Sequence, residues 1–475
     1  MGRVGRGLSV CFGVVVVLVL TIRVPAFATP GGTATIAVSD RSTGATIRPA
    51  LTGVVWHDTG APLTTLAPLS VRTVRIDASL QAISPARGVV NVQPLLDRIS
   101  AVRAVGGDPL VILSYMPKWL GSCTLPFADA TFCKPAALDD WGALIRQVVN
   151  AVATAPSGNA TRFEVWNEPD LLVSWMDTPW SWLDVAARTG REIMGVERAL
   201  GRRLSFGGPA SFIPDPFNIG TFLLRMYAEG VRVDFVSWHW YANYPFFGPD
   251  GNEFPTLAPV YPLLGHRNPF LSPMGYGVQI NAVRALVAAK AALAGQPVPA
   301  LYIDEWNLSA GGFDNRNGTN EAAAFAAATL IEMQNAGLDE AMMYRATDKE
   351  ANPGDWGMTT MAGAKKPVWG ALKFWQELAG EQLDVRGSDP VGGVWAIASR
   401  DAGRVTVLVA NFAPALSFDR AARVELPASM AKARATIRTI GPMDPVGVPR
   451  SVDAQGGGVT FDAPKQSVTF VEFAA

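Results

Sequence analysis

The sequence predicts an α/β protein in which a (β/α)8 TIM barrel is followed by a small C-terminal all-β sandwich domain. Over residues 49–380, short apolar runs alternate with stretches of helical periodicity. The runs are mostly continuous, which is typical of parallel strands that are covered on both faces. After residue 380 the pattern changes to short strands separated by turn residues, so a second domain is expected over residues 381–475.

Eight apolar, β-branched runs are the expected strands of the barrel. They are Gly53–His57, Thr73–Asp77, Leu110–Tyr115, Arg162–Trp166, Arg203–Gly207, Phe235–Tyr241, Ala300–Glu305 and Glu340–Arg345. The expected helices are Val92–Val105, Leu138–Ala153, Ser181–Leu200, Asn218–Glu229, Ile280–Ala294, Asn320–Ala336 and Pro367–Leu378. Repeated strand–helix units imply right-handed parallel crossovers, and eight units favour a closed barrel over an open sheet. No Gly-x-Gly-x-x-Gly motif opens a helix after the first strand, which argues against a dinucleotide-binding sheet.

The C-terminal domain is expected to contain six short strands. They are Val394–Ser399, Val405–Asn411, Arg423–Leu426, Ala435–Ile440, Gly458–Phe461 and Ser467–Phe473. The simplest arrangement of such strands is a sandwich that packs beside the barrel.

The first 28 residues are expected to be a signal peptide and not part of the fold. Two arginines precede an apolar run, Leu8–Ile22, and Ala26-Phe27-Ala28 fits the small-residue cleavage rule. An uncleaved membrane anchor is the alternative, but a run of about fifteen residues is shorter than the ~20 that span a bilayer. Cleavage leaves residues 29–48 as an N-terminal segment and predicts a secreted, periplasmic or cell-envelope protein without a membrane span.

Charge and cysteine content narrow the classes of partner. Lys and Arg number 40 and Asp and Glu 41, so no basic excess supports nucleic-acid binding. After signal cleavage two cysteines remain, Cys123 and Cys133, and an oxidising compartment favours a disulfide between them. A metal site is the alternative, but His57, His239 and His266 show no ligand spacing with the cysteines. We therefore expect no metal.

Two glutamates at strand ends are the strongest functional signal. The fourth strand ends in Asn167-Glu168-Pro169 and the seventh in Asp304-Glu305-Trp306. In a (β/α)8 barrel the active site lies at the C-terminal ends of the strands, so both carboxylates should face the same mouth. Glycoside hydrolysis needs such a pair, because one carboxyl protonates the leaving oxygen while the other attacks the anomeric carbon or activates water.

Other polar residues are expected at the same mouth. Arg75 near the end of the second strand would keep a nucleophilic carboxylate ionised, and His239 and Tyr241 at the sixth would donate to it or to sugar hydroxyls. Each residue also has a purely structural interpretation. Arg75 can form a barrel salt bridge, His239 can be a satisfied core histidine, and Glu168 can be a helix-start acid. Glu305 can pair with Arg345.

Tryptophans are concentrated near the expected mouth. Ten of the 14 lie at strand ends or just after them: Trp56, Trp119, Trp166, Trp175, Trp180, Trp182, Trp238, Trp240, Trp306 and Trp356. Core packing explains part of this set, and the remainder suits a carbohydrate cleft because the apolar faces of sugar rings stack on indole. We expect Trp119, Trp306 and Trp356 to line that cleft, with Trp306 or another mouth tryptophan as a wall. The long aromatic loop Ala242–Gly277 should border it.

These residues resemble the retaining glycosidases of clan A, and within that clan they are most similar to glycoside hydrolase family 39. The Asn-Glu-Pro motif and the seventh-strand glutamate carry the clan resemblance. The motifs similar to those of the family are Met116-Pro117-Lys118-Trp119-Leu120, Gly207-Gly208-Pro209-Ala210 and Lys366-Pro367. The resemblance covers roughly residues 50–475 and includes the small β domain.

The resemblance implies a role for each site residue. Glu168 would be the acid/base and Glu305 the nucleophile, and Asn167 would hold the sugar 2-hydroxyl. The other expected substrate contacts are Arg75, His57 on the floor after the first strand, and His239 and Tyr241 beside the cleaved bond, together with Trp119, Trp306 and Trp356. A retaining mechanism requires the two carboxyl groups to lie about 5–5.5 Å apart.

The sequence thus predicts a secreted retaining glycoside hydrolase that needs no metal or organic cofactor. It would cleave O-glycosidic bonds of a polysaccharide or oligosaccharide by double displacement. Alternatives are a transglycosidase that remodels a surface polysaccharide, a non-catalytic glycan-binding barrel and a structural envelope protein. The sequence leaves several properties open: the sugar, the linkage, the anomeric configuration, exo or endo action, and the oligomeric state.

Overall fold

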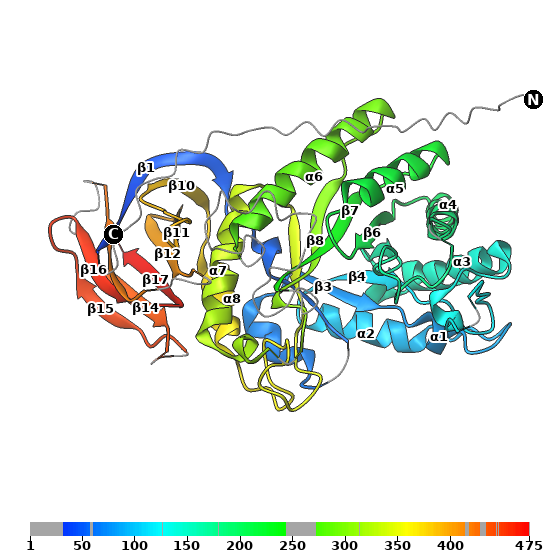
Figure 1. Ribbon diagram of the computed structural model, residues 1–475, viewed down its shortest axis with the longest axis horizontal. Coiled ribbons are helices and arrows are strands. Elements are labelled where there is room, and N and C mark those ends of the chain that lie inside the picture. Colours follow the sequence, from blue (N-terminus) through cyan, green and yellow to red (C-terminus); the bar gives the residue numbers. More distant parts are fainter. Residues whose placement is uncertain are drawn as a thin grey trace, which may run out of the picture.

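The computed structural model describes residues 32–57, 60–125, 127–178, 180–243, 272–312, 314–413, 418–427, 434–442, 444 and 446–474. The expected signal peptide and most of the expected aromatic loop, residues 244–271, lie outside the described residues. Two β structures account for nearly all described strands, and they are connected in Figure 1 through the helices α7 and α8.

A closed barrel of eight parallel strands forms the larger part of the molecule. Its strands are β2 Gly53–Val55, β3 Thr73–Asp77, β4 Asp108–Leu113, β5 Arg162–Val165, β6 Ser205–Ser211, β7 Phe235–Asn243, β8 Ala300–Ser309 and β9 Glu340–Met343. The hydrogen-bonded order follows the sequence, and β2 closes the barrel by pairing with β9. The predicted (β/α)8 barrel is therefore confirmed.

Helices follow the barrel strands and surround the sheet (Figure 1). They are α1 Leu80–Ile83, α2 Gln93–Ala104, α3 Leu138–Thr154, α4 Trp182–Leu200, α5 Pro216–Ala228, α6 Met274–Leu293, α7 Asn320–Asn335 and α8 Pro367–Glu377. Strands β6, β7 and β8 run further than the apolar pattern predicts, because residues at the mouth continue the ladder. Trp240 pairs with Trp306 and Tyr241 with Asn307, so β8 continues past Glu305 as a paired strand.

The second β structure is one nine-stranded sheet. Its members are β1 Ala34–Thr46, β10 Glu381–Arg386, β11 Val394–Asp401, β12 Arg404–Asn411, β13 Arg420–Glu425, β14 Arg434–Ile440, β15 Arg450–Asp453, β16 Gly458–Ala463 and β17 Ser467–Ala474. Their order is β15-β14-β17-β12-β11-β10-β1-β13-β16. The sheet therefore includes the N-terminal segment, for which the sequence predicts no element: β1 pairs antiparallel with β10 and parallel with β13.

This sheet folds over itself into the expected two-layered arrangement. Val424 in β13 and Phe461 in β16 belong to the same buried cluster as Ile437 in β14, although the hydrogen-bonded order places them at opposite ends. A sheet brings its two ends into one core only by bending, so its halves face each other as the layers of a sandwich do.

The sheet and the barrel share a continuous core. Side chains alternate along β12, so Leu408 and Ala410 join the barrel cluster while Val407 and Val409 join the cluster inside the sheet. The same alternation holds in β11 and β17, and helix α7 lies between the sheet and the barrel with its alanines buried on both sides. The shared core fixes the orientation of the two domains.

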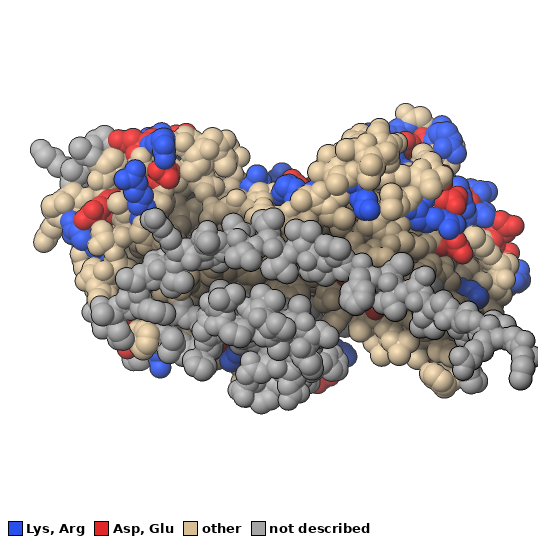
Figure 2. Space-filling view, turned by 45° about the horizontal axis from the view of Figure 1, so that its top comes forward, with Lys and Arg blue, Asp and Glu red and all other residues tan. Residues whose placement is uncertain are grey.

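The described surface carries no large region of one charge on the face in Figure 2. Positive and negative side chains are interspersed there, as the near-zero net charge suggests. Among the described helices, none combines the length and the apolar character that crossing a bilayer requires.

Candidate active site

Glu168 is presented to the mouth by a strained turn that directly follows β5. Its φ is 50°, and φ is 61° at Trp166 and 51° at Ala210 on the neighbouring loop. A residue other than glycine in this region costs about 1–3 kcal/mol, and such strain is concentrated at functional sites. The backbone N–H of Glu168 donates to the carbonyl of Ala210 at 2.9 Å, which ties the loop after β5 to the end of β6.

A register shift in β8 brings two consecutive acids into the barrel. The pairing of β8 with β9 is irregular between Ile303 and Trp306, and its pairing with β7 skips Asp304. In a regular strand neighbouring side chains point to opposite faces, whereas Asp304 and Glu305 both contact Arg75 inside the barrel. The bulge thus adds a second carboxylate to the interior.

Both oxygens of Glu305 accept hydrogen bonds from fixed donors. Arg75 Nη1 donates to Oε1 at 2.7 Å and the Tyr241 hydroxyl donates to Oε2 at 2.8 Å. Burial raises the pKa of Tyr241 well above its ordinary value, and the adjacent Glu305 raises it further, so this hydroxyl keeps its proton. Two donors on one carboxylate fix its orientation in the site.

Glu168 has a different environment. Its Oε1 lies 2.8 Å from His239 Nδ1, and its side chain is 15% exposed. One oxygen of Glu168, one of Glu305 and a ring nitrogen of His239 all lie within 4.8 Å of one another. The two carboxyl groups are therefore close enough for one to act on a carbon while the other acts on the bonded oxygen.

His239 connects the catalytic pair to deeper charge. Burial works against its protonation, but Glu305 and Asp304 outweigh burial and raise its pKa well above the ordinary value. The imidazolium then donates to Glu168 from Nδ1, and its Nε2 faces Asp304 Oδ2 at 3.7 Å.

Two further acids that the sequence analysis does not single out lie beneath the site. Arg75 Nε donates to Glu164 Oε2 at 2.7 Å and lies 3.1 Å from Asp304 Oδ2, and all three side chains are fully buried. Burial, together with Asp304, raises the pKa of Glu164 to about 8, although Arg75 works to lower it. Burial also works to raise the pKa of Asp304, but Arg75 and His239 lower it. Of the two acids, Glu164 is therefore the one that takes up a proton more readily.

Asn167 is oriented by the same guanidinium. Its Oδ1 accepts from Arg75 Nη2 at 2.9 Å, and its Nδ2 donates to the Tyr115 hydroxyl at 2.9 Å. Both ends of the amide are fixed, which leaves one N–H of Nδ2 for a substrate hydroxyl.

Aromatic residues form the side of the mouth near β2 and β9. The ring of Tyr344, which follows β9, lies 5.5 Å from His57, 5.3 Å from Trp356 and 6.1 Å from Tyr241. Burial, with Arg345 and Arg75 adding to it, lowers the pKa of His57 to about 3, so its imidazole is neutral. Tyr344 has no signal in the sequence beyond its place at a strand end.

Trp306 does not form the expected wall. Its side chain is fully buried and its ring lies 6.2 Å from Tyr276 in α6 and 6.5 Å from Phe325 in α7. The shift that turns Glu305 inward turns Trp306 outward, toward the helices. Trp119 is half-buried in the loop after β4, where its indole donates to Ser84 and Arg87 lies over its ring. Within the described residues, the polar and ring contacts of Trp119 are thus with Ser84 and Arg87 and not with either glutamate.

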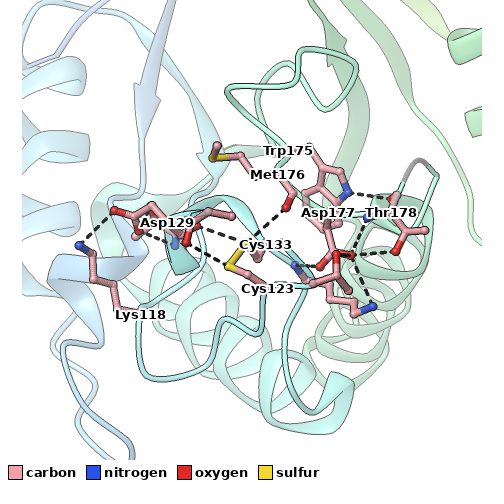
Figure 3. Close-up of a disulfide and its surroundings, with 12 residues drawn as sticks. Lys118, Cys123, Asp129, Cys133, Trp175, Met176, Asp177 and Thr178 are labelled. Carbon is pink, nitrogen blue, oxygen red and sulfur yellow. Dashed lines mark hydrogen bonds and ion pairs between the residues drawn. A yellow bond between two sulfur atoms is a disulfide. The ribbon is translucent and has the colours of Figure 1, made fainter. Parts of the chain in front are cut away.

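The expected disulfide is present and supports the loop after β5 (Figure 3). Cys123 and Cys133 are joined, with Cα atoms 5.2 Å apart. The backbone N–H of Met176 donates to Phe132 at 2.7 Å, and Asp177 lies 3.4 Å from Lys134 Nζ. The disulfide loop therefore fixes residues that follow Glu168 in the chain.

Glu168, His239 and Glu305 are also spaced closely enough to share a cation. Arg75 and the protonated imidazole of His239 already place two positive charges on these carboxylates, which disfavours a third. The donor set therefore suits proton transfer and nucleophilic attack better than metal binding.

Comparisons with known proteins agree with the motifs. Residues 87–261 match the model of "Glycosyl hydrolases family 39". A β-xylosidase of Geobacillus stearothermophilus is 27% identical over 305 residues, which are 61% of this chain and 56% of that protein. The match thus spans little more than half the length of that relative.

Solved structures share the fold. A monomeric β-xylosidase from Caulobacter crescentus CB15 superposes with a TM-score of 0.71 at 18% identity, covering 93% of this chain and 99% of that one. A GH39 enzyme from Xanthomonas axonopodis pv. citri gives 0.69 at 20% identity, with 94% and 98% covered. The chain is therefore similar to the glycosyl hydrolases of family 39, as its motifs predict.

Proposed function

We propose that the protein is a retaining glycoside hydrolase that cleaves an O-glycosidic bond with Glu305 as nucleophile and Glu168 as acid/base. One observation carries this proposal: the carboxyl oxygens of the two residues approach within 4.8 Å in one mouth. Retaining enzymes hold their carboxyl groups about 5–5.5 Å apart, whereas inverting enzymes need about 6.5–9.5 Å to admit a water.

The first step forms a glycosyl ester. Glu305 attacks the anomeric carbon through Oε1 or Oε2, and Glu168 in its acid form gives its proton to the departing glycosidic oxygen. His239 holds both groups in position, because its Nδ1 lies 2.8 Å from Glu168 Oε1 and 3.5 Å from Glu305 Oε2. Arg75 and Tyr241 hold Glu305 in place during the attack.

The second step releases the sugar. Glu168, now a carboxylate, removes a proton from a water molecule, whose oxygen attacks the anomeric carbon. The bond to Glu305 breaks, Glu305 becomes a carboxylate again and Glu168 regains its proton. Two inversions give net retention of the anomeric configuration.

The relatives suggest the first substrates. Two of them are named as β-xylosidases, so β-xylosides head the panel that we propose. We also propose that the protein is exported, with the disulfide Cys123–Cys133 in support. N-terminal sequencing of the protein recovered from its native host tests export, because cleavage after Ala28 should make Thr29 the first residue.

The proposed activity is tested with aryl β-glycosides and with neutral and acidic oligosaccharides, the anomer of the first product being read by NMR. A retained anomer supports the proposal, and an inverted first product would contradict it. A 2-deoxy-2-fluoroglycoside of the accepted sugar should label one peptide, and that peptide should contain Glu305. Product analysis also separates hydrolysis from transfer to a second sugar.

A further inference from the structure

Exposed apolar side chains gather between the loops that follow β5 and β6. Trp180 is 37% exposed and Phe217 64%, and their rings meet edge to face with centroids 5.0 Å apart. Leu172, 67% exposed, lies on the same hollow of about 290 Å³. We refer to the space lined by Pro169, Asp170, Leu172, Trp180, Asp215 and Phe217 as the aromatic hollow.

Polar groups are fixed in the same hollow. Asp215 accepts from the backbone N–H of Phe217 at the start of α5, and Asn218 Nδ2 donates to Asp215 at 2.8 Å and toward Asp170 at 3.4 Å. Asp170 also accepts from the backbone of Phe212. Each carboxylate keeps lone pairs for further donors. Flat apolar rings beside oriented acceptors match a sugar unit, which has an apolar C–H face and hydroxyl donors.

The aromatic hollow adjoins the candidate active site along the chain. Pro169, which lines the hollow, directly follows Glu168, and the hydrogen bond from Glu168 to Ala210 joins the two loops that form it. An acid/base lies at the glycosidic oxygen, so the leaving part of a substrate must pass on the side of Glu168.

The same loops are held in shape before any ligand binds. Trp175, also part of the lining, donates to Ser181, and Asp177 is fixed by Thr124 and Lys134 of the disulfide loop (Figure 3). A preformed hollow binds without the cost of ordering its walls.

We propose that the aromatic hollow binds a neutral sugar unit in the leaving part of the substrate, so that the enzyme prefers glycans that extend beyond the cleaved bond. The inference rests on the proposed function and adds to it a substrate class. Rings of Trp180 and Phe217 take the apolar face of that unit, and the carboxylates take its hydroxyls. Asp170 and Asp215 repel an anionic unit, so uronate-bearing glycans are disfavoured.

The experiment compares short and long substrates. For the double variant Trp180→Ala/Phe217→Ala, the fall in kcat/KM should be about tenfold larger on oligosaccharides of three or more units than on the aryl glycoside. Phe418 in the β domain is 37% exposed, as Trp180 is, and serves as the control. Phe418→Ala should change kcat/KM on neither substrate. Equal losses on both substrates, or no loss on the longer ones, would overturn the proposal.

A binding arm separates this inference from the proposed function. In a Glu305→Gln background, calorimetry with neutral xylo-, gluco- and manno-oligosaccharides should detect binding that weakens when Trp180 and Phe217 are truncated. If the wild-type protein turns over none of the panel, the proposed function fails; if no oligosaccharide binding depends on the two rings, the hollow fails as a sugar site.

Charge provides a further measurement. Asp215→Asn keeps the cap of α5, because asparagine also accepts from a backbone N–H. It should reduce the preference for neutral over uronate-bearing oligosaccharides about threefold. A preference that stays constant would contradict the electrostatic part of the proposal.

Discussion

Two ion clusters lie one above the other inside the barrel. We expect the lower cluster to contribute to stability and the upper cluster to contribute to catalysis. At the lower level Arg162 Nη1 pairs with Glu340 Oε1 at 2.6 Å, and Thr73 and Tyr302 complete the hydrogen bonds. At the upper level Arg75 faces three carboxylates, those of Glu164, Asp304 and Glu305.

The two clusters come from the same strands. Arg75, Glu164 and Asp304 each follow a member of the lower cluster by two residues, on β3, β5 and β8 respectively. Residues i and i+2 of a strand share a face, so each strand contributes one side chain to each level. The lower level balances one cation with one anion. The upper level sets three carboxylates against Arg75, and His239 adds a second positive charge.

The same substitution at both levels gives the largest contrast. Glu305→Gln should lower kcat/KM by on the order of 10⁴-fold or more, because an amide forms no glycosyl ester. Glu340→Gln removes the acid that faces Arg162 and should leave kcat/KM within about threefold while lowering the free energy of unfolding by about 1–3 kcal/mol. Steady-state kinetics and urea unfolding measure both. Substantial turnover by folded Glu305→Gln would remove that residue from the nucleophile role.

The acid/base assignment makes the next largest prediction. Glu168→Ala should slow a substrate with a poor leaving group by about 10²–10⁴-fold. An aryl glycoside with a good leaving group needs little protonation, so its first step should be nearly unaffected. Pre-steady-state release of the phenol measures that step. Losses of equal size on both substrates would show that Glu168 is not the general acid.

Asp304 is a positioning residue whose effect should appear in the pH profile. Glu305 and, next to it in size of effect, Asp304 raise the pKa of His239. Asp304→Asn removes one of these negative neighbours and therefore lowers that pKa. The imidazolium then loses its proton at lower pH, and the basic limb of kcat/KM should move to lower pH. A merely structural role would reduce activity without moving the limb.

Much of the fold follows from local patterns, and the exceptions are non-local. Continuous apolar runs such as Phe235–Tyr241 identify barrel strands because both of their faces are covered. The segment Ala34–Thr46 is polar, and half of its residues are exposed, so its pattern indicates no strand. It becomes one by pairing with β10 and β13, both more than 300 residues away along the chain.

The site was predictable where chemistry lies at strand ends. The roles of Glu168 and Glu305 could be predicted from their positions at the ends of barrel strands. Glu164 is a single acid within a short strand, and its role is visible only in the folded protein, where Arg75 donates to it. The bulge in β8 leaves no mark in the sequence. It reverses the parity of the strand, which explains why Trp306 points to the helices and why Asp304 joins Arg75.

The smallest predicted effect is a change in how stability depends on pH. The pKa of Glu164 rises from 4.5 to about 8 mainly because burial opposes its ionisation. The native state therefore holds a proton that the unfolded state releases between about pH 4.5 and 8. Linkage makes this contribution fully present below the unfolded pKa and lost as pH rises through the folded pKa, so the free energy of unfolding should fall across that window.

Glu164→Gln isolates this contribution, because glutamine can accept from Arg75 through its oxygen and donate to Ser237 Oγ through its amide, but cannot ionise. Urea unfolding at pH 5 and pH 8 should show that the free energy of unfolding falls more for the wild type than for the variant. Asp77 and Asp170, whose pKa values burial raises to about 6, contribute equally to both proteins and cancel in this comparison. Glu340→Gln leaves Glu164 in place in the upper cluster. The free energy of unfolding of this variant should therefore change with pH as it does in the wild type. A variant with the same slope as the wild type would mean that the upper cluster holds no such proton, and the balance of charge around Arg75 would have to be reassigned.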